Sequence, residues 1–318
     1  MMQENTGEQG YNIMSIILQS IPSDAAITKI EYEGPMIALY TKNPKYLMEN
    51  NQIISNMVNM IKKRIIVRTD ESIRKSEEDA RNILIQLLPK DAEVKSTFFD
   101  TALGEITVEV KKPWIVNQPD TSTNDFNMIE LINKTGWKIR VKKASHIQSE
   151  MMKQVNYTLK MNANERNKFY KYVGDQIFRP KLDQTAEASL LTLGGFGEVG
   201  RSCMLLTTHE SKILLDCGIN PGARESLNAF PRLDWANIEL DELDAIVISH
   251  AHLDHTGFLP VIFKYGYKGP IYCSEPTLPL MTLIQNDMIK VAMVEGKIPL
   301  YTERDIKEVI KHTITLPY

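Results

Sequence analysis

The sequence predicts an α+β protein, with two copies of an α-β-β-α-β unit followed by a region of strands and glycine-rich turns. The two copies are indicated by apolar residues that recur with helical spacing and then alternate, in the same order twice before residue 145. The later region is indicated by short apolar runs separated by glycines from Ala188 onward. This change in composition predicts a domain boundary near residue 185.

The first copy occupies residues 1–70 and the second occupies residues 71–145. In the first we expect a helix at 11–21, strands at 27–32 and 36–40, a helix at 44–63 and a strand at 64–68. In the second we expect a helix at 72–88, strands at 92–99 and 104–110, a helix at 124–135 and a strand at 137–141. The shared order and similar length indicate an internal duplication.

A long polar helix is expected to connect the duplicated part to the rest of the chain. It spans about 146–178 and ends before Pro180, within a helical connector assigned to residues 146–185. The last domain is then residues 186–318.

The composition is that of an ordinary globular protein, with 43% hydrophobic and 24% charged residues and a formal net charge of −3. The chain is therefore not a polycation, and contact with nucleic acid requires a local basic surface. Two clusters could supply one, although a solvated face is the common alternative. Their members are Lys62, Lys63, Arg64 and Arg68, and Lys138, Arg140, Lys142 and Lys143.

The three cysteines, Cys203, Cys217 and Cys273, form no CxxC pair. This spacing argues against a zinc ribbon, a redox motif and a disulfide framework, and it favours a reducing cytoplasm. The N-terminal residues have no basic region followed by a long apolar run, so we expect no secretory signal. No apolar run reaches the roughly 18 residues that a membrane span needs, so we expect no membrane partner.

A cluster of metal-binding residue types follows the apolar run 244–249, which we expect to be a buried strand. Its members are His250, His252, Asp254 and His255. Imidazole and carboxylate groups suit Zn²⁺. Alternation directs His250 and His252 toward one metal ion, while Asp254 and His255 can turn toward a neighbouring one. Two such ions about 3.5–4 Å apart can activate water and clamp a phosphodiester. The alternative is a solvated loop.

A second carboxylate, Asp216, ends the apolar run 212–215. We assign it a supporting catalytic role, in which it orients a ligand histidine or the attacking water. The alternative is a turn aspartate that precedes Gly218. The glycine-rich run 194–200 lacks the Lys-Ser/Thr of a phosphate-binding loop, and we predict a tight turn near the site.

Three segments, 193–203, 214–218 and 249–257, resemble the metallo-β-lactamase domain of the β-CASP nucleases, and 265–277 adds to the likeness. The order of elements in the two earlier units resembles that of KH RNA-binding modules. A chain with both features resembles the archaeal homologues of cleavage and polyadenylation specificity factor.

The resemblance implies a zinc-dependent endoribonuclease of RNA 3′-end formation and transcription termination. It also implies that residues 186–318 are the first half of an αββα fold. In the family, the counterparts of His250, His252, Asp254 and His255 bind two zinc ions, and the counterpart of Asp254 also helps hold the attacking water. Asp216 matches the aspartate that opens the family's motif series. RNA is the expected partner, and any homodimer contact is expected in the family's C-terminal part.

The sequence departs from the family pattern at two places. The family continues beyond the position of Tyr318, so we expect a truncated sequence whose last metal ligands lie elsewhere. His312, the only later histidine, is expected on the surface. KH modules usually grip the nucleic-acid backbone with a GxxG loop, and neither 40–46 nor 111–120 contains one.

Two alternatives to the nuclease follow from these observations. The chain could be an RNA-binding or regulatory module without catalysis of its own. It could also be a small-molecule metallo-hydrolase, such as a thioesterase or a lactamase, with the same histidine motif. The duplicated N-terminal unit argues against the latter, because a small substrate does not need it.

Overall fold

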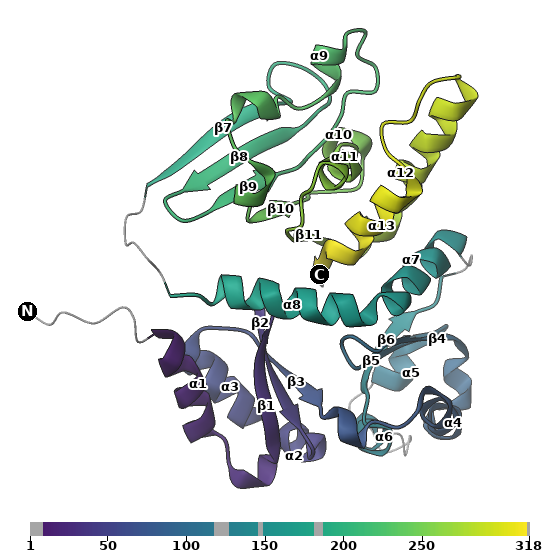
Figure 1. Ribbon diagram of the computed structural model, residues 1–318. Helices are drawn as coiled ribbons and strands as arrows, with labels where there is room; N and C mark the ends of the chain where they lie inside the picture. The colour runs from purple at the N-terminus through teal and green to yellow at the C-terminus, as the bar shows by residue number, and fades with distance from the viewer. Residues whose placement is uncertain (1–8, 118–126, 146–148, 181–186, 317–318) are drawn as a thin grey trace, which may run out of the picture. The chain divides into compact units, whose positions relative to one another are not determined.

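The computed structural model describes residues 9–117, 127–145, 149–180 and 187–316 (Figure 1). The chain forms two compact units. The first comprises Met1–Gln148 and Lys160–Pro180, and the second comprises Ser149–Leu159 and Lys181–Tyr318. Among the described residues, no helix is both long and apolar enough to cross a membrane.

The first module of the first unit has one helix more than the sequence predicted. Its elements are α1 (Gln9–Ser20), β1 (Ile27–Glu33), β2 (Met36–Thr41), α2 (Pro44–Glu49), α3 (Asn51–Ile61) and β3 (Ile65–Thr69). The expected helix 44–63 is broken at Asn50, whose backbone leaves the helical region at φ −112°, ψ 49°. The Asn50 side-chain amide donates to the Tyr46 carbonyl at 2.9 Å, so it competes with the helical hydrogen bonds.

The second module repeats this order. Its elements are α4 (Glu77–Leu87), β4 (Val94–Asp100), β5 (Glu105–Val110), α5 (Pro113–Asn117), α6 (Met128–Thr135) and β6 (Lys138–Lys143). In each module the first two strands pair antiparallel and the last two pair parallel. The structure therefore confirms the repeated order of elements and adds the short helix α5. Residues 124–126 of the expected helix 124–135 lie outside the described residues.

Alternation in β5 sorts side chains as the sequence predicted. Ile106, Val108 and Val110 are fully buried in the core of the module. Thr107 and Glu109 face the opposite side, where they pair in register with Arg140 and Lys142 of β6. Arg140 and Lys142 therefore lie on the polar outer face of the sheet.

A buried charge network joins the two modules of the first unit. Arg68 of β3 is only 1% exposed. Its guanidinium binds the Glu33 carboxylate at 2.9 Å and the Glu105 carboxylate at 2.6 Å. Lys138 adds a second cation to Glu105 at 2.9 Å. Burial opposes the charge of Arg68, but the two carboxylates outweigh it and raise the pKa of the guanidinium.

The expected single helix over 146–178 is wrong, because two helices, α7 (Glu150–Met161) and α8 (Ala163–Ile177), meet at Asn162. Val155 of α7 lies in the hydrophobic core of the second unit. Helix α8 belongs to the first unit, where Arg166 binds the Asp100 carboxylate at 3.0 Å. Gly174 of α8 approaches β1 so closely that a Cβ would lie 2.6 Å from Tyr32 Cβ. Residues 146–148 and 181–186 of the expected connector lie outside the described residues.

The second unit is built on one six-stranded sheet in the order β12-β11-β10-β9-β8-β7. Its strands are β7 (Ala188–Gly194), β8 (Cys203–Thr208), β9 (Lys212–Leu215), β10 (Ala245–Val247), β11 (Ile271–Ser274) and β12 (Thr313–Leu316). Strands β7, β8 and β9 pair antiparallel, and β9 to β12 run parallel. Its other helices are α9 (Ser226–Ala229), α10 (Leu253–Thr256), α11 (Leu259–Lys264), α12 (Thr277–Val294) and α13 (Glu303–His312).

The two faces of this sheet differ in how far they are covered. Leu205, Leu214 and Ile246 pack into the core on one face, together with residues of α11, α12 and α13. Figure 1 shows α10 to α13 gathered on one side of the sheet. The opposite side, which we call the open face, is also apolar. Its residues are Leu190, which is 53% exposed, Val247, which is 40% exposed, and the half-buried Met204, Leu206, Ile213 and Leu215.

Candidate metal centre

The candidate site lies at the end of β10, in the middle of the sheet. This strand pairs parallel with β9 on one side and with β11 on the other. The sheet pairing continues past its end, since Ile248 donates to the Tyr272 carbonyl at 2.8 Å. The chain then turns through Ser249–His252, and α10 begins at Leu253. The short apolar strand thus delivers the histidine cluster to the edge of a rigid layer, as the sequence predicted.

The imidazoles converge on one another. The Nε2 atom of His250 and the Nδ1 atom of His252 are 3.1 Å apart. The rings of His250 and His255 have centroids 4.0 Å apart. One ligand atom from each of His250, His252 and Asp254 can be chosen so that all three lie within 4.8 Å of one another. Three such atoms around one point can share one cation.

His255 occupies a second position in the cluster. Its Nε2 atom lies 3.5 Å from the Asp254 carboxylate, while its Nδ1 atom lies 2.7 Å from the Asp216 carboxylate. A carboxylate beside Nδ1 favours the proton on that nitrogen and leaves the Nε2 lone pair free for a metal. His255 and Asp254 therefore face each other as a second pair of candidate ligands.

Asp216 is buried, and its carboxylate is the hub of the polar contacts beneath the histidines. It accepts hydrogen bonds from the Ser249 backbone N–H at 2.8 Å and from the Ser249 hydroxyl at 2.9 Å. Its backbone is left-handed, with a φ of 59°, a conformation that non-glycine residues keep only when their surroundings fix it. These contacts fit the orienting role that we predicted for Asp216 and that remains a prediction.

The electrostatics of the cluster suit a cation. Burial, followed by the neighbouring His255 and His252, lowers the pKa of His250. His250 therefore remains neutral, and its lone pair remains available, to a lower pH than for a free imidazole. Three imidazoles and a carboxylate form a donor set typical of Zn²⁺. The residues present fit a metal ion.

Glycine permits the close approach of the loop that follows Asp216. A Cβ on Gly218 would lie 1.7 Å from the Asp254 carbonyl oxygen. The backbone N–H groups of Cys217 and Ile219 donate to the carbonyls of His255 and Leu253 at 2.8 and 3.0 Å. Gly218 therefore lets the two loops share backbone hydrogen bonds, a requirement that the Asp-Cys-Gly pattern alone did not reveal.

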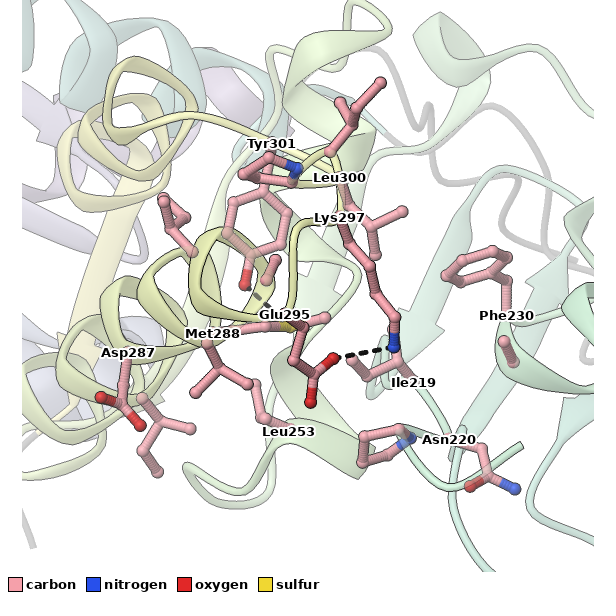
Figure 2. Close-up of a pocket in the computed structure, with 18 of the residues that line it drawn as sticks. Ile219, Asn220, Phe230, Leu253, Asp287, Met288, Glu295, Lys297, Leu300 and Tyr301 are labelled. Carbon is pink, nitrogen blue, oxygen red and sulfur yellow. Dashed lines mark hydrogen bonds and ion pairs between the residues drawn. The ribbon is translucent and has the colours of Figure 1, made fainter. Parts of the chain in front are cut away.

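A cavity of about 490 Å³ lies beside the motif. Leu253, between two candidate ligands, forms part of its wall, together with Ile219 and Phe230. Figure 2 shows that Met288 of α12 and Lys297 of the following loop also line it. Lys297 binds Glu295 at 2.7 Å. The walls are mostly apolar.

The candidate RNA-binding residues separate into three groups. Lys62, Lys63 and Arg64 are exposed at the turn between α3 and β3. The prediction that Arg68 contacts RNA is wrong. Arg68 is buried in the network with Glu33 and Glu105, so it cannot form part of an RNA-binding surface. Charge spacing in the sequence could not reveal this. Lys138 and Arg140 lie on β6, where Lys138 is held by Glu105.

We expected His312 on the surface, and the structure shows it half-buried. Its side chain is only 19% exposed, and its ring lies 5.0 Å from the ring of Phe263. Its Nδ1 atom lies 2.9 Å from the Glu308 carbonyl oxygen. The amphipathic helix α13 turns its last residue toward the core.

All three cysteines are free and buried in the second unit. Burial raises the pKa of the Cys273 thiol to about 12. Burial and the neighbouring Cys203 also raise the pKa of Cys217. Thiols in such surroundings are weak nucleophiles at neutral pH.

Comparison with known proteins matches both parts of the chain. Residues 8–74 match the KH domain of transcription termination factor FttA, and residues 196–312 match the metallo-β-lactamase superfamily. The chain combines a KH domain with a metallo-β-lactamase domain. The metallo-β-lactamase match includes His250, His252, Asp254 and His255, and the KH match includes the first module.

Several relatives are similar along nearly the whole chain. Proteins named transcription termination factor FttA are 57% identical in Cenarchaeum symbiosum over 99% of this chain, 39% identical in Methanothermobacter thermautotrophicus over 96% and 41% identical in Thermococcus kodakarensis over 96%. The match covers 48% of each relative. The chain thus spans about half the length of these relatives.

Proposed function

We propose that this chain is the RNA-binding and metal-binding part of a zinc-dependent endoribonuclease that acts in RNA 3′-end formation and transcription termination. The observation that carries the proposal is the convergence of His250, His252 and Asp254, with His255 oriented beside them by Asp216. The likeness to relatives named as termination factors supports the choice of process. Because the chain spans about half of those relatives, the activity is proposed for the full-length protein.

In this proposal His250, His252 and Asp254 hold one zinc ion, and Asp254 with His255 faces a second. When bound, the metal ions supply Lewis acidity and activate water at neutral pH. Asp216 keeps the His255 ring oriented, and Ser249 fixes Asp216 through its backbone and hydroxyl. The Asp254 carboxylate, which is half-buried, also helps to hold the attacking water. The cytoplasm, a reducing compartment, agrees with three free thiols.

The first unit would bring RNA to this site. The exposed cations Lys62, Lys63 and Arg64 are the residues that we propose for phosphate contact. Arg140 of β6 is a weaker candidate, because its strand pairs with the acidic β5. KH modules recognise single-stranded RNA, which agrees with a nuclease that cuts unpaired transcripts.

The test compares Asp254 of α10 with Asp244, which directly precedes β10, in the full-length protein. Asp254→Ala removes a proposed ligand and should abolish cleavage of a single-stranded RNA, as should excess EDTA. Asp244→Asn is the matched control, since Asp244 lies outside the histidine cluster and accepts a hydrogen bond from the Lys212 backbone at 2.8 Å. Full cleavage in EDTA, or in the Asp254 variant, would refute the metal-dependent nuclease.

The same experiment distinguishes the alternatives. RNA binding by the full-length protein without cleavage, with zinc present, would favour a binding or regulatory module. Hydrolysis of a thioester or lactam without action on RNA would favour a small-molecule hydrolase.

A further inference from the structure

Arg201 makes an unusually complete set of contacts next to the metal centre. Its Nε and Nη2 atoms donate to the two carboxylate oxygens of Glu198 at 2.7 and 3.1 Å. Its Nη1 atom donates to the carbonyls of Leu227 and Phe230 at 2.7 and 3.0 Å. The side chain is only 12% exposed. One guanidinium therefore ties the glycine-rich turn to the segment that carries α9.

The backbone beside this guanidinium leads directly to the candidate ligands. The Arg201 N–H donates to the Ile219 carbonyl at 3.0 Å, and the next N–H, of Ser202, donates to the Asp254 carbonyl at 2.7 Å. Ile219 in turn donates to the Leu253 carbonyl at 3.0 Å. The segment 201–202 thus contacts both the loop after Asp216 and the loop that carries the histidines.

The conformation of Arg201 shows that its surroundings fix it. Its φ of 45° lies in the left-handed region, which L-residues with a side chain rarely adopt. The preceding Gly200 is also left-handed and packs against Asn220, where a Cβ would lie 2.9 Å from Asn220 Cβ. The four side-chain hydrogen bonds of Arg201 and the backbone hydrogen bonds of residues 201 and 202 hold this conformation in place.

We propose that Arg201 is a positioning residue for the metal centre. The hydrogen bonds of its guanidinium fix the glycine-rich turn. The Ser202 N–H can then hold the Asp254 backbone, and with it the Asp254 carboxylate, in the metal-binding position. Through the Phe230 carbonyl Arg201 also sets one wall of the adjacent cavity (Figure 2). The proposal rests on the proposed metal-binding function, and it adds a residue outside the ligand set.

The test uses Arg201→Ala and Arg201→Lys in the full-length protein. Arg232→Ala is the matched control, because Arg232 also grips an acid through two bonds, to Asp234 at 2.9 and 2.7 Å. Two quantities are measured: hydrogen exchange of the Ser202 and Ile219 amides in the metal-free chain, and Zn²⁺ affinity by competition with a chromogenic chelator. The absorption spectrum of the Co²⁺-loaded chain reports the ligand geometry.

In Arg201→Ala we expect both amides to exchange at least about tenfold faster and Zn²⁺ to bind about 10–100-fold more weakly, as for other residues that orient ligands. The Co²⁺ bands should shift. Lysine keeps the charge but cannot reach Glu198 and both carbonyls together, so its variant should lie between alanine and wild type. Arg232→Ala should leave all three readouts unchanged.

Several outcomes would overturn the proposal. One is an unchanged exchange rate in Arg201→Ala, and another is faster exchange with unchanged Zn²⁺ affinity, which would mark Arg201 as merely structural. Equal losses in Arg232→Ala would do the same. If Arg201→Ala does not fold, wild-type exchange and affinity in the lysine variant would contradict it. A wild-type full-length protein that binds no Zn²⁺ would refute the proposed function, while the exchange data would still decide whether Arg201 fixes the loop.

Discussion

The sheets of the two units distribute apolar residues differently. In the second KH-like module, β5 buries Ile106, Val108 and Val110 on one face and presents Thr107 and Glu109 on the other. In the metallo-β-lactamase domain, neighbouring leucines serve both faces: Leu214 is fully buried, while Leu215 lies on the open face. The sheet of the KH-like module has a polar outer face, whereas the sheet of the metallo-β-lactamase domain is apolar on both faces.

This difference indicates how each unit is stabilised. Strands that are apolar on both faces are typical of sheets covered by two layers, so the open face has the composition of an interior surface. In the first unit, the buried charged side chains instead form ion pairs. Arg68 lies between Glu33 and Glu105, and Arg166 pairs with Asp100. We therefore expect charge substitutions to damage the first unit most, and apolar truncation on the covered face to damage the second.

The largest effect is expected for Arg68→Met. The substitution leaves Glu33 and Glu105 buried without their shared cation, which typically costs about 3–5 kcal/mol of unfolding free energy. Urea unfolding of the first unit, followed by hydrogen exchange of its β2 and β5 amides, measures the loss. Arg64→Met, at an exposed position four residues earlier, should have little effect. Equal stability of the two variants would contradict the role of the buried network.

Leucine truncation tests the two faces of the large sheet. Leu214→Ala opens a cavity in the core and should cost about 3 kcal/mol. Leu190→Ala, on the open face, should change the unfolding free energy by no more than about 0.5 kcal/mol, but it should reduce binding of a hydrophobic dye. Chemical denaturation and dye fluorescence of both variants provide the comparison. A large loss of stability in Leu190→Ala would show that the open face is already covered.

Added zinc should stabilise the second unit and leave the stability of the first unit unchanged. A ligand that binds the folded state alone adds about 2.7 kcal/mol at a concentration 100 times its dissociation constant. Hydrogen exchange should therefore slow in strands β9 and β10 and remain unchanged in β2 and β5. Protection of both units to the same extent would mean that the ion does not bind at the histidine cluster alone.

The smallest effect is expected for the pH dependence of the stability that ionised Glu105 contributes. Burial opposes its ionisation, but Arg68 and Lys138 outweigh burial and lower its pKa below the ordinary 4.5. A lowered folded-state pKa stabilises above the unfolded-state value, and this contribution is lost as the pH falls through the folded-state value. The stability difference between wild type and Glu105→Gln should therefore shrink as the pH falls below about 4.5. A difference independent of pH would contradict the ion pair.

Local patterns in the sequence predicted most of the elements. The alternation in β5 and the apolar run before His250 each depend on neighbours along the chain, and both are confirmed as strands. Asn50 was missed because its effect depends on a side-chain bond to Tyr46 that competes with the helix. The charge of Arg68 was visible, but its burial was not, because its partners lie 35 and 37 residues away in the chain.

The candidate site shows the same limit. The four proposed ligands stand within six positions, so their residue types and spacing sufficed. The residues that support them come from three separate segments: Ser249 beside the motif, Gly218 after β9, and Arg201 after the glycine-rich turn. Gly218 is marked by the close approach of two loops and Arg201 by a left-handed φ, and neither feature can be recognised before the chain is folded.

The burial of all three thiols has a practical consequence. At neutral pH, alkylating reagents such as maleimides should react slowly with Cys203, Cys217 and Cys273 in the folded chain. A cysteine introduced at an exposed position, for example in place of Lys63 or Glu295, would then be the preferred point of attachment for a fluorophore or spin label. An exposed cysteine can thus be labelled without first replacing the native cysteines.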